Sequence, residues 1–478
     1  MGFSACAPSQ ENREKKDLFF YCAAGMKPAV EKIAKAYQQE FGVTVNIQYG
    51  GSGTLLSNLR IAKGNADLYL AADQSYIDNA REYDLIEEVQ PVAFLRPVIA
   101  VAKGNPKNIQ GLNDLKNPEI KTALANPDAA SVGRQTKKIL QGTGDWDAIN
   151  ANVKVLKPTV NEVANDIKLG AIDAGIIWDA TANQYPEIEQ ISVPEFDAHR
   201  KKVTVAVLKS SSNPTQTLHF IRYMASKNKG LKVFEELGYQ AVEGDTWEDQ
   251  PEILFYSGGV NRVAIEKTIQ AFEKREGVNV TRVYNGCGIL VSQIKAGQNP
   301  DAYFSCDRSF MDDVQSRFTD IQDVSHTKIV ILTNKENTHQ IHSLEDLTKE
   351  GISVGVCNPQ QSALGALTAR MLEGMGLLEG VMKNVKVQTP TADLLVNQLK
   401  TGALGAAIVY EANTSQVKDQ LTVIPLSNEG ALAVQNFGIS TNSKHKYLTQ
   451  RLFQTITSQT SKANFENNGF GWEYQQAN

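Results

Sequence analysis

The most constraining feature of this sequence is that its first half recurs in its second half. Phe20-Tyr21 returns as Phe255-Tyr256, an offset of 235 positions, and many of the following positions match in the same register. Further along the offset is 232 positions, where Asn152-Val-Lys-Val155 returns as Asn384-Val-Lys-Val387. Chance does not maintain register over so many positions, so the sequence predicts a tandem duplication.

Length and composition fit two soluble globular domains. The chain has 478 residues, of which 42% are hydrophobic and 21% charged, with a net charge of −5. We expect the copies at residues 17–249 and 250–478, each large enough for a substantial core. The longest apolar runs, such as Ile329-Val-Ile-Leu332, are far shorter than the roughly 18 residues that a transmembrane helix needs. An acidic balance without a basic stripe argues against nucleic acid as a partner.

Within each copy, short apolar runs alternate with amphipathic segments. Residues 18–21 predict a strand, residues 28–41 a helix, and residues 43–47 a second strand. Alternating strands and helices are typical of mostly parallel sheets with helices on both faces. The predicted fold class is therefore α/β, with two tandem domains that each consist of two α/β lobes around a cleft.

The strongest chemical signal lies at two strand-to-helix turns. Gly50-Gly-Ser-Gly-Thr54 opens a helix, and Ala23-Ala-Gly25 forms a similar turn after the first strand. Free N–H groups and the positive end of the helix dipole favour an anion at such places. The alternative is that the glycines only form turns and Ser52 caps its helix. No lysine follows the glycines, so the segment is not a P-loop.

Signatures of an enzyme are missing from the sequence. The six histidines form no HExxH or other dense metal spacing, and no Gly-x-Ser-x-Gly elbow occurs. We therefore expect neither catalysis nor a cofactor.

The N-terminus predicts an extracytoplasmic, lipid-anchored protein. Small residues precede Cys6 and a polar, charged stretch follows it, which resembles a bacterial lipobox in which the cysteine is lipidated. Residues 1–16 would then be a tether to the membrane. The alternative is a disordered tag with an incidental cysteine.

Four segments together resemble the extracytoplasmic molybdate-binding proteins of ABC transporters. The resemblance implies a type II periplasmic-binding fold, in which two lobes joined by two crossing strands close on a tetrahedral oxyanion such as molybdate or tungstate. It also implies a permease as partner, and crossings near residues 96–102 and 201–207. The segments that carry it are Tyr21-Cys-Ala-Ala-Gly-Met-Lys-Pro28, Tyr49-Gly-Gly-Ser-Gly-Thr-Leu-Leu56, Asp67-Leu-Tyr-Leu-Ala-Ala-Asp73 and Gly175-Ile-Ile-Trp-Asp179.

In that family two serines, two backbone amides and a tyrosine hydroxyl surround the anion. In the first copy, Gly25 stands where the family has its first serine, so that hydroxyl is absent. Ser52 retains the second serine. Trp178 stands at the place of the tyrosine and donates only an indole N–H. The ligand-binding residues that the resemblance implies for the first copy are Ala24, Gly25, Ser52, Gly53, Val132, Val160 and Trp178.

The second copy departs further from the family. Its serine places are Val260 and Cys287, its amide places are Leu364 and Ala392, and only Tyr410 is kept. This copy either binds another ligand, through Ser257, Cys287 and Tyr410 with Asn285 and Cys306 as further candidates, or has become structural. Cys287, Cys306 and Cys357 are expected at one cleft, where a soft-metal or redox role competes with plain burial.

The sequence also leaves open a different ligand for the first cleft and a different class of function. If Asp128, Glu162 or Asp179 pointed into the first cleft, each would repel an oxyanion, so a cation or a small organic ligand is the rival. A duplicated interaction scaffold is the alternative from another class of function, and it is favoured by the lost ligand groups of the second copy.

Overall fold

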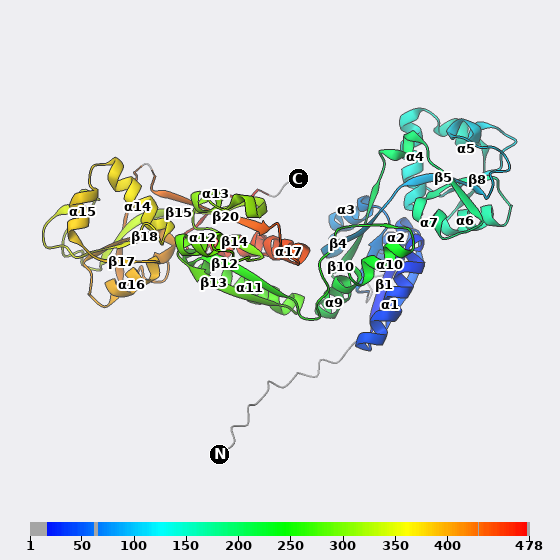
Figure 1. The fold of residues 1–478 in the computed structure, drawn as a ribbon. Coiled ribbons are helices and arrows are strands. Elements are labelled where there is room, and N and C mark those ends of the chain that lie inside the picture. The colour runs from blue at the N-terminus through cyan, green and yellow to red at the C-terminus, as the bar shows by residue number, and fades with distance from the viewer. Residues whose placement is uncertain (1–16, 62–65, 429, 476–478) are drawn as a thin grey trace, which may run out of the picture. The chain divides into compact units, whose positions relative to one another are not determined.

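The computed structural model describes residues 17–61, 66–428 and 430–475. The predicted tether at residues 1–16, with Cys6, lies outside the described residues. The chain divides into two compact units, Met1–Asp249 and Gln250–Asn478, and each is described by itself (Figure 1). Among the described residues, no helix combines the length and the apolar character that crossing a membrane requires.

The first lobe of the first unit contains a six-stranded sheet in the order β11-β4-β10-β3-β1-β2. Strands β1, β2 and β3 run parallel, and β10 pairs antiparallel with β3 and β4. The helices of this lobe include α1 (Lys27–Phe41), α2 (Ser52–Ile61) and α3 (Gln74–Glu82). The strands are β1 (Leu18–Ala23), β2 (Val45–Gly50), β3 (Leu68–Ala71), β4 (Ile86–Leu95), β10 (Lys201–Leu208) and β11 (Gln240–Ala241).

The second lobe of this unit contains a five-stranded sheet in the order β7-β6-β8-β5-β9. The chain passes between the lobes at Arg96 and again just before Lys201, at the crossings that the resemblance implied. The strands are β5 (Pro97–Ala102), β6 (Thr122–Ala125), β7 (Val153–Lys157), β8 (Ala174–Trp178) and β9 (Ile188–Ile191), and the helices include α4 (Ser131–Thr143), α5 (Trp146–Asn152), α6 (Val160–Lys168) and α7 (Asp179–Asn183).

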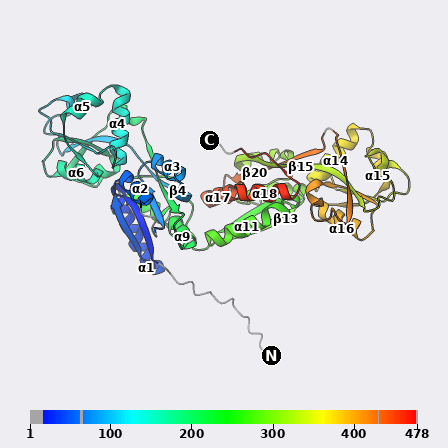
Figure 2. The ribbon, with the colours of Figure 1, turned by 180° about the vertical axis from the view of Figure 1, so that it is seen from behind.

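The second unit repeats this plan but joins both lobes in one ten-stranded sheet (Figure 2). Its long strand β15 (Phe318–Asn334) runs through both lobes, where the first unit has β4 and β5 separated by Arg96. The other strands include β12 (Glu252–Gly258), β13 (Asn279–Asn285), β14 (Ala302–Phe304), β16 (Val354–Cys357), β17 (Val385–Thr389), β18 (Ala406–Tyr410) and β20 (Leu432–Ser440).

The long helices of the two units show why these sequences fold alike. Helix α1 buries Val30, Ile33 and Tyr37 on one face, and it ends at Gly42, whose φ of 69° is left-handed. Helix α11 (Arg262–Glu276) ends in the same way at Gly277, with a φ of 67°. Glycine adopts this conformation without steric cost, so the recurring Gly-Val pair ends both helices at the same point.

Candidate functional site

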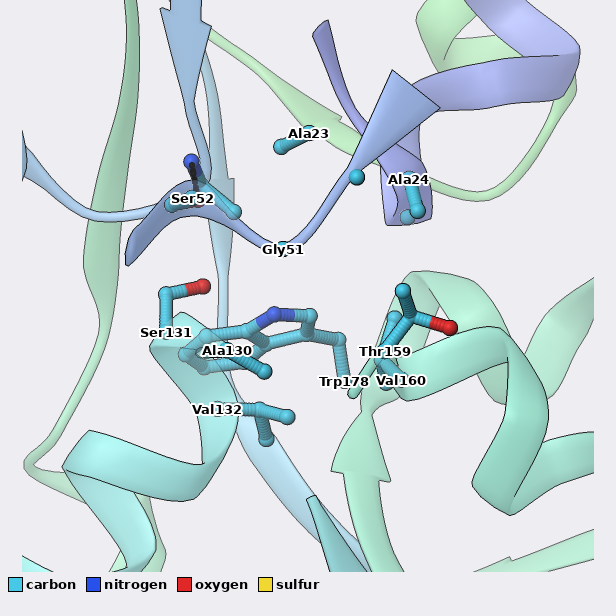
Figure 3. A pocket seen from close by; sticks show the side chains of 13 residues that line it. Ala23, Ala24, Gly51, Ser52, Ala130, Ser131, Val132, Thr159, Val160 and Trp178 are labelled. Atoms are coloured by element: carbon cyan, nitrogen blue, oxygen red, sulfur yellow. Dashed lines mark hydrogen bonds between the residues drawn. The ribbon is translucent and has the colours of Figure 1, made fainter. Parts of the chain in front are cut away.

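A small cavity lies between the two lobes of the first unit (Figure 3). The space between its atoms, counted together with the open solvent at its mouth, is about 240 Å³. The enclosed part is much smaller, so the cavity suits a ligand of only a few heavy atoms. Its lining residues are Ala23, Ala24, Gly25, Gly50, Gly51, Ser52, Ala72, Ala130, Ser131, Val132, Thr159, Val160 and Trp178.

Helix N-termini from both lobes converge on this cavity. The short 3-10 turn η1 (Ala24–Met26) and helix α2 begin at it from the first lobe, and α4 and α6 begin at it from the second. Neither η1 nor α4 has a side-chain cap on its first N–H groups. The first-turn N–H groups of a helix have no intrahelical acceptor and carry the positive end of its dipole. At α2 the Gly53 and Thr54 N–H groups already donate to the Ala129 carbonyl, and Thr159 caps α6. The uncapped starts of η1 and α4, together with the dipoles of the other two helices, favour a negative charge in this small space.

Three side chains add donors to these N–H groups. The Oγ of Ser52 accepts a hydrogen bond from the Ala72 N–H at 3.2 Å, which leaves its hydroxyl proton for a ligand. Ser131 is 4% exposed, and Figure 3 shows its hydroxyl pointing toward Ser52. Trp178 is 1% exposed and its indole nitrogen faces Gly51 in the same view. These donors come from opposite lobes, so one small ligand can contact both.

No lining residue of the cavity carries a charged side chain. Asp128 is exposed, and Glu162 is held by the hydroxyl of its own helix cap, Thr159, at 3.0 Å. The carboxylate of Asp179 accepts the N–H groups of Arg96 and Ala180, at 3.1 and 2.8 Å. The three acids considered in the sequence therefore do not line the cavity.

Glycines let the lobes approach at the edge of the cavity. A Cβ on Gly53 would lie 2.5 Å from the Asp128 carbonyl oxygen, and one on Gly51 would collide with the Ala129 carbonyl. The close approach allows the Gly53 N–H to donate to the Ala129 oxygen at 2.9 Å, which links the first lobe to the second. The predicted site residue Gly53 thus contributes to lobe contact and does not line the cavity.

Gly25 lies against the second lobe. A Cβ on Gly25 would lie 3.2 Å from Val160 Cγ1, which is a tight contact, and 3.7 Å from Trp178 Cδ1, which is an ordinary one. A larger side chain at position 25 would therefore press first on Val160. The carbonyl of Gly25 accepts the hydroxyl of Tyr239 at 2.5 Å, which fixes the turn.

Six of the seven residues that the sequence analysis names for the first copy line the cavity: Ala24, Gly25, Ser52, Val132, Val160 and Trp178. Ser131 was not among the predicted residues, although this serine lies next to Val132 at the predicted helix start. A hydroxyl residue at a strand-to-helix turn was the available signal. Small residues such as Ala23 and Ala72 were not among the predicted residues either, because their types carry no chemical signal.

In the second unit the corresponding positions are apolar or thiol-bearing. Val260 and Leu364, at the places of Gly25 and Val132, are 6% and 1% exposed. Ser257 is fully buried at the end of β12, and its hydroxyl donates to the Gly258 carbonyl at 3.3 Å. Tyr410 is 3% exposed, and its hydroxyl has no hydrogen-bond partner among the described residues.

The three cysteines of the second unit do not form a metal site within the described part of the chain. No group of three or more His, Cys, Asp or Glu side chains there is placed to hold a metal ion. Burial raises the pKa of Cys357 to about 11, so this thiol is protonated at neutral pH. The thiol of Cys357 lies 3.8 Å from the hydroxyl of Thr389.

Two α/β lobes, linked by crossing segments around a cavity of hydrogen-bond donors, define a type II periplasmic binding protein. Proteins of this class bind small solutes for ABC transporters. The chain belongs to the bacterial extracellular solute-binding protein family, whose model matches residues 18–240 and again residues 253–471. The family model thus matches the chain twice, once in each copy of the internal repeat.

Individual relatives each align with about half of this chain. A Haemophilus influenzae protein that is provisionally named a binding protein is 26% identical over 223 residues, which are 47% of this chain and 90% of that protein. The molybdate-binding protein ModA of Escherichia coli is 22% identical over 227 residues, 46% of this chain and 87% of ModA. The periplasmic molybdate-binding protein of Azotobacter vinelandii, a solved structure, is 16% identical, with a TM-score of 0.41 and coverage of 47% of this chain and 98% of its own.

Proposed function

We propose that the first unit binds a small tetrahedral oxyanion and delivers it to the permease of an ABC transporter. The observation that carries the proposal is the uncharged cavity, where the uncapped starts of η1 and α4, two serine hydroxyls and an indole N–H meet without a charged side chain. Similarity to ModA of Escherichia coli makes molybdate or tungstate the first candidates.

The anion would act as the link between the lobes. In the open form, the turn at Ser52 and the start of α4 at Ser131 would both face water. Binding places one oxyanion against donors of both lobes, and the Gly53–Ala129 hydrogen bond adds to the closed state. The ligand favours closure only by its higher affinity for the closed form.

The lining also supports a choice among anions. A hydrogen phosphate carries a P–OH group that needs an acceptor, and the side-chain acceptors of the lining are the hydroxyls of Ser52, Ser131 and Thr159, which accept more weakly than a carboxylate does. Molybdate, tungstate and sulfate are fully deprotonated at neutral pH and need only donors. We therefore expect phosphate to bind more weakly than these dianions.

The test is isothermal titration of the full chain with molybdate, tungstate, sulfate and phosphate. We expect Ser52→Ala to weaken molybdate binding by about 10- to 100-fold, because a hydrogen bond to a charged group contributes about 1.5–3 kcal/mol. Ser57→Ala is the matched control, since Ser57 lies on the same helix but is exposed. The proposal fails if none of these dianions binds the folded chain, or if both variants weaken binding equally.

In the second unit we propose no oxyanion site, because its lining positions lack the hydroxyl donors of the first. The apolar and thiol side chains at Val260, Cys287 and Leu364 are poor partners for a desolvated negative charge. One anion per chain in the titration is the expected stoichiometry, and two anions per chain would contradict this assignment. A unit without a ligand is available as an interaction scaffold.

We further propose that Cys6 carries a lipid anchor that holds the protein at the outer side of the membrane. Support comes from the small residues before Cys6 and the polar stretch after it. The test is labelling with a radioactive fatty acid in a bacterial host, with the sequence placed behind a lipoprotein signal peptide. Loss of label in Cys6→Ser supports the anchor, and equal label in both proteins contradicts it.

A further inference from the structure

Two cysteine thiols meet in the second unit near the carboxyl ends of strands β12 and β14. Cys287 is the first residue of α12 (Cys287–Lys295), and Cys306 follows strand β14. The Cys306 N–H donates to the Cys287 sulfur at 3.1 Å. A Cβ on Gly258 would lie 3.0 Å from the Cys287 sulfur and would collide with that of Cys306. Both sulfurs therefore crowd around the point where Gly258 lacks a side chain.

The first unit shows how this pair arose. Register places Cys287 at Ser52, Cys306 at Ala72 and Gly258 at Ala23. The Ala72 N–H donates to Ser52 Oγ at 3.2 Å, just as the Cys306 N–H donates to the Cys287 sulfur, so the same backbone-to-side-chain hydrogen bond occurs in both units. Gly258 lacks the methyl group that Ala23 has, and this gives the sulfur of Cys306 its room. The two units thus differ at three positions that together bring two thiols close to each other.

The other described cysteines are not arranged in this way. The thiol of Cys22 donates to the adjacent Ala23 carbonyl at 3.6 Å, and Cys357 faces Thr389. Cys287 and Cys306 are 0% and 5% exposed, so a bond between their sulfurs would be shielded from reductants in the folded protein.

We propose that Cys287 and Cys306 form a disulfide when the protein folds in an oxidising compartment. Members of this family are extracellular, where disulfides form and persist. The oxidant is an external disulfide. One cysteine thiolate attacks it to give a mixed disulfide and one free thiol, and the second cysteine thiolate then displaces the other half. An S–S bond forms between the protein sulfurs, the external S–S bond breaks, and the two protons and two electrons leave with two external thiols.

The disulfide would change the second unit in two ways. It ties the start of α12 to the end of β14, which constrains the unfolded chain and stabilises the unit. It also consumes both thiol hydrogens at the position where the first unit offers the Ser52 hydroxyl. This proposal does not depend on which ligand the first unit binds.

Peptide mapping tests the bond directly. The full chain is refolded from denaturant in a buffer of oxidised and reduced glutathione, so that burial does not limit access to the thiols. The refolded protein is denatured in the presence of iodoacetamide, so that the buried thiols that remain are blocked, and it is then digested without reduction. We expect a linked peptide pair containing Cys287 and Cys306, with Cys22 and Cys357 alkylated. Alkylation of both Cys287 and Cys306, or their linkage to other partners, would overturn the proposal. The chain secreted into the periplasm of a bacterial host is mapped in the same way.

Thermal unfolding gives the second measurement. Because the bond is buried, it is reduced with dithiothreitol in denaturant, and the protein is refolded with dithiothreitol present. We expect the melting midpoint of the second unit to be lower, by on the order of 5–10 °C, than after refolding with glutathione. The double variant Cys287→Ser/Cys306→Ala, which restores the residue types of the first unit, should show no such shift, and Cys357→Ser should keep it. A wild-type midpoint that does not respond to reduction would contradict the proposal.

Discussion

The two units share one fold but differ in what their clefts contain and in how their lobes are joined. The first unit presents Ser52 and Ser131 with helix N–H groups, whereas the second presents Cys287 and the buried Val260 and Leu364. Both units keep the glycine contact between the lobes, since the Gly288 N–H donates to the Gln361 carbonyl at 3.0 Å as Gly53 does to Ala129. Duplication therefore preserved lobe closure and changed the chemistry inside the cleft. This separation indicates that closure depends on backbone contacts and ligand choice on side chains.

The junction of the lobes differs because of one residue. Pro97 has no N–H and begins β5 after the break at Arg96. Its counterpart Ile329 donates its N–H to the Ala431 carbonyl at 2.8 Å, and β15 continues without a break. Proline cannot donate to a ladder, which explains why one unit has two strands where the other has one.

The largest expected effect comes from placing a charge in the cleft of the first unit. In Ser131→Asp the carboxylate would lie at the start of α4 and occupy the place of the anion, where the helix dipole stabilises it. Repulsion at about 4 Å is worth about 4 kcal/mol near a protein surface, which is about a thousandfold in affinity. Titration with molybdate measures it. Ser131→Asn is the uncharged control, and equal losses in both variants would show that charge is not the cause.

The next prediction makes the first unit resemble the second. The triple variant Ala23→Gly/Ser52→Cys/Ala72→Cys transfers the thiol pair to the first cleft. We expect it to weaken oxyanion binding by about 10- to 100-fold, because a thiol is a weaker donor to a charged group than a hydroxyl. Retained affinity under reducing conditions would mean that the backbone N–H groups alone hold the ligand. The single variant Ala72→Cys serves as the control for packing.

A third prediction concerns the continuous strand of the second unit. Ile329→Pro removes the hydrogen bond to the Ala431 carbonyl and should interrupt β15, with a loss of about 1–3 kcal/mol in the free energy of unfolding. Ile329→Val keeps the N–H and should cost only about 0.5–1.5 kcal/mol. Urea denaturation followed by circular dichroism compares them. If both variants lost the same stability, the hydrogen bond would not be the reason for the continuous strand.

Much of this architecture could be predicted from the sequence. The duplication, the α/β class and the crossing near Arg96 follow from register and from hydrophobic alternation, because both signals extend over many residues. The turns at Gly25 and Ser52 could be placed because glycine and serine have specific roles at helix starts. These are local properties of the chain.

What the sequence could not predict depends on contacts between distant segments. Ser131 enters the cavity because α4 of one lobe faces α2 of the other, and the approach of Gly25 to Val160 occurs across the cleft. The sequence placed Cys287, Cys306 and Cys357 at one cleft, but which two of them meet depends on Gly258, which alone has the character of an ordinary turn residue. Expectations drawn from residue type were thus incomplete wherever a small residue determines the distance between larger ones.

The smallest expected effect concerns the hydrogen bonds that fix the residues after Trp178 in the first unit and after Tyr410 in the second. Asp179 accepts the Arg96 N–H in the first unit, whereas in the second the hydroxyl of Thr327 accepts the Ala412 N–H at 3.2 Å. Burial raises the pKa of Asp179, and its backbone hydrogen bonds and the guanidinium groups of Arg96 and Arg200 only partly oppose this. The folded state therefore holds this proton more tightly than the unfolded state does.

The sign of the pH dependence follows from that raised pKa. The contribution of Asp179 to stability is complete below its unfolded pKa, near 3.8, and is lost as the pH rises through its folded value. Asp179→Asn keeps an acceptor oxygen but has no proton to lose. The variant should therefore gain stability relative to wild type as the pH rises above 4, by about 1.4 kcal/mol for each unit by which the pKa is raised. Urea denaturation of both proteins at several pH values measures the difference. A constant difference across the series would mean that the pKa of Asp179 is the same in the folded and unfolded chain. The Asp179 carboxylate would then cost the first junction no more stability than the Thr327 hydroxyl costs the second.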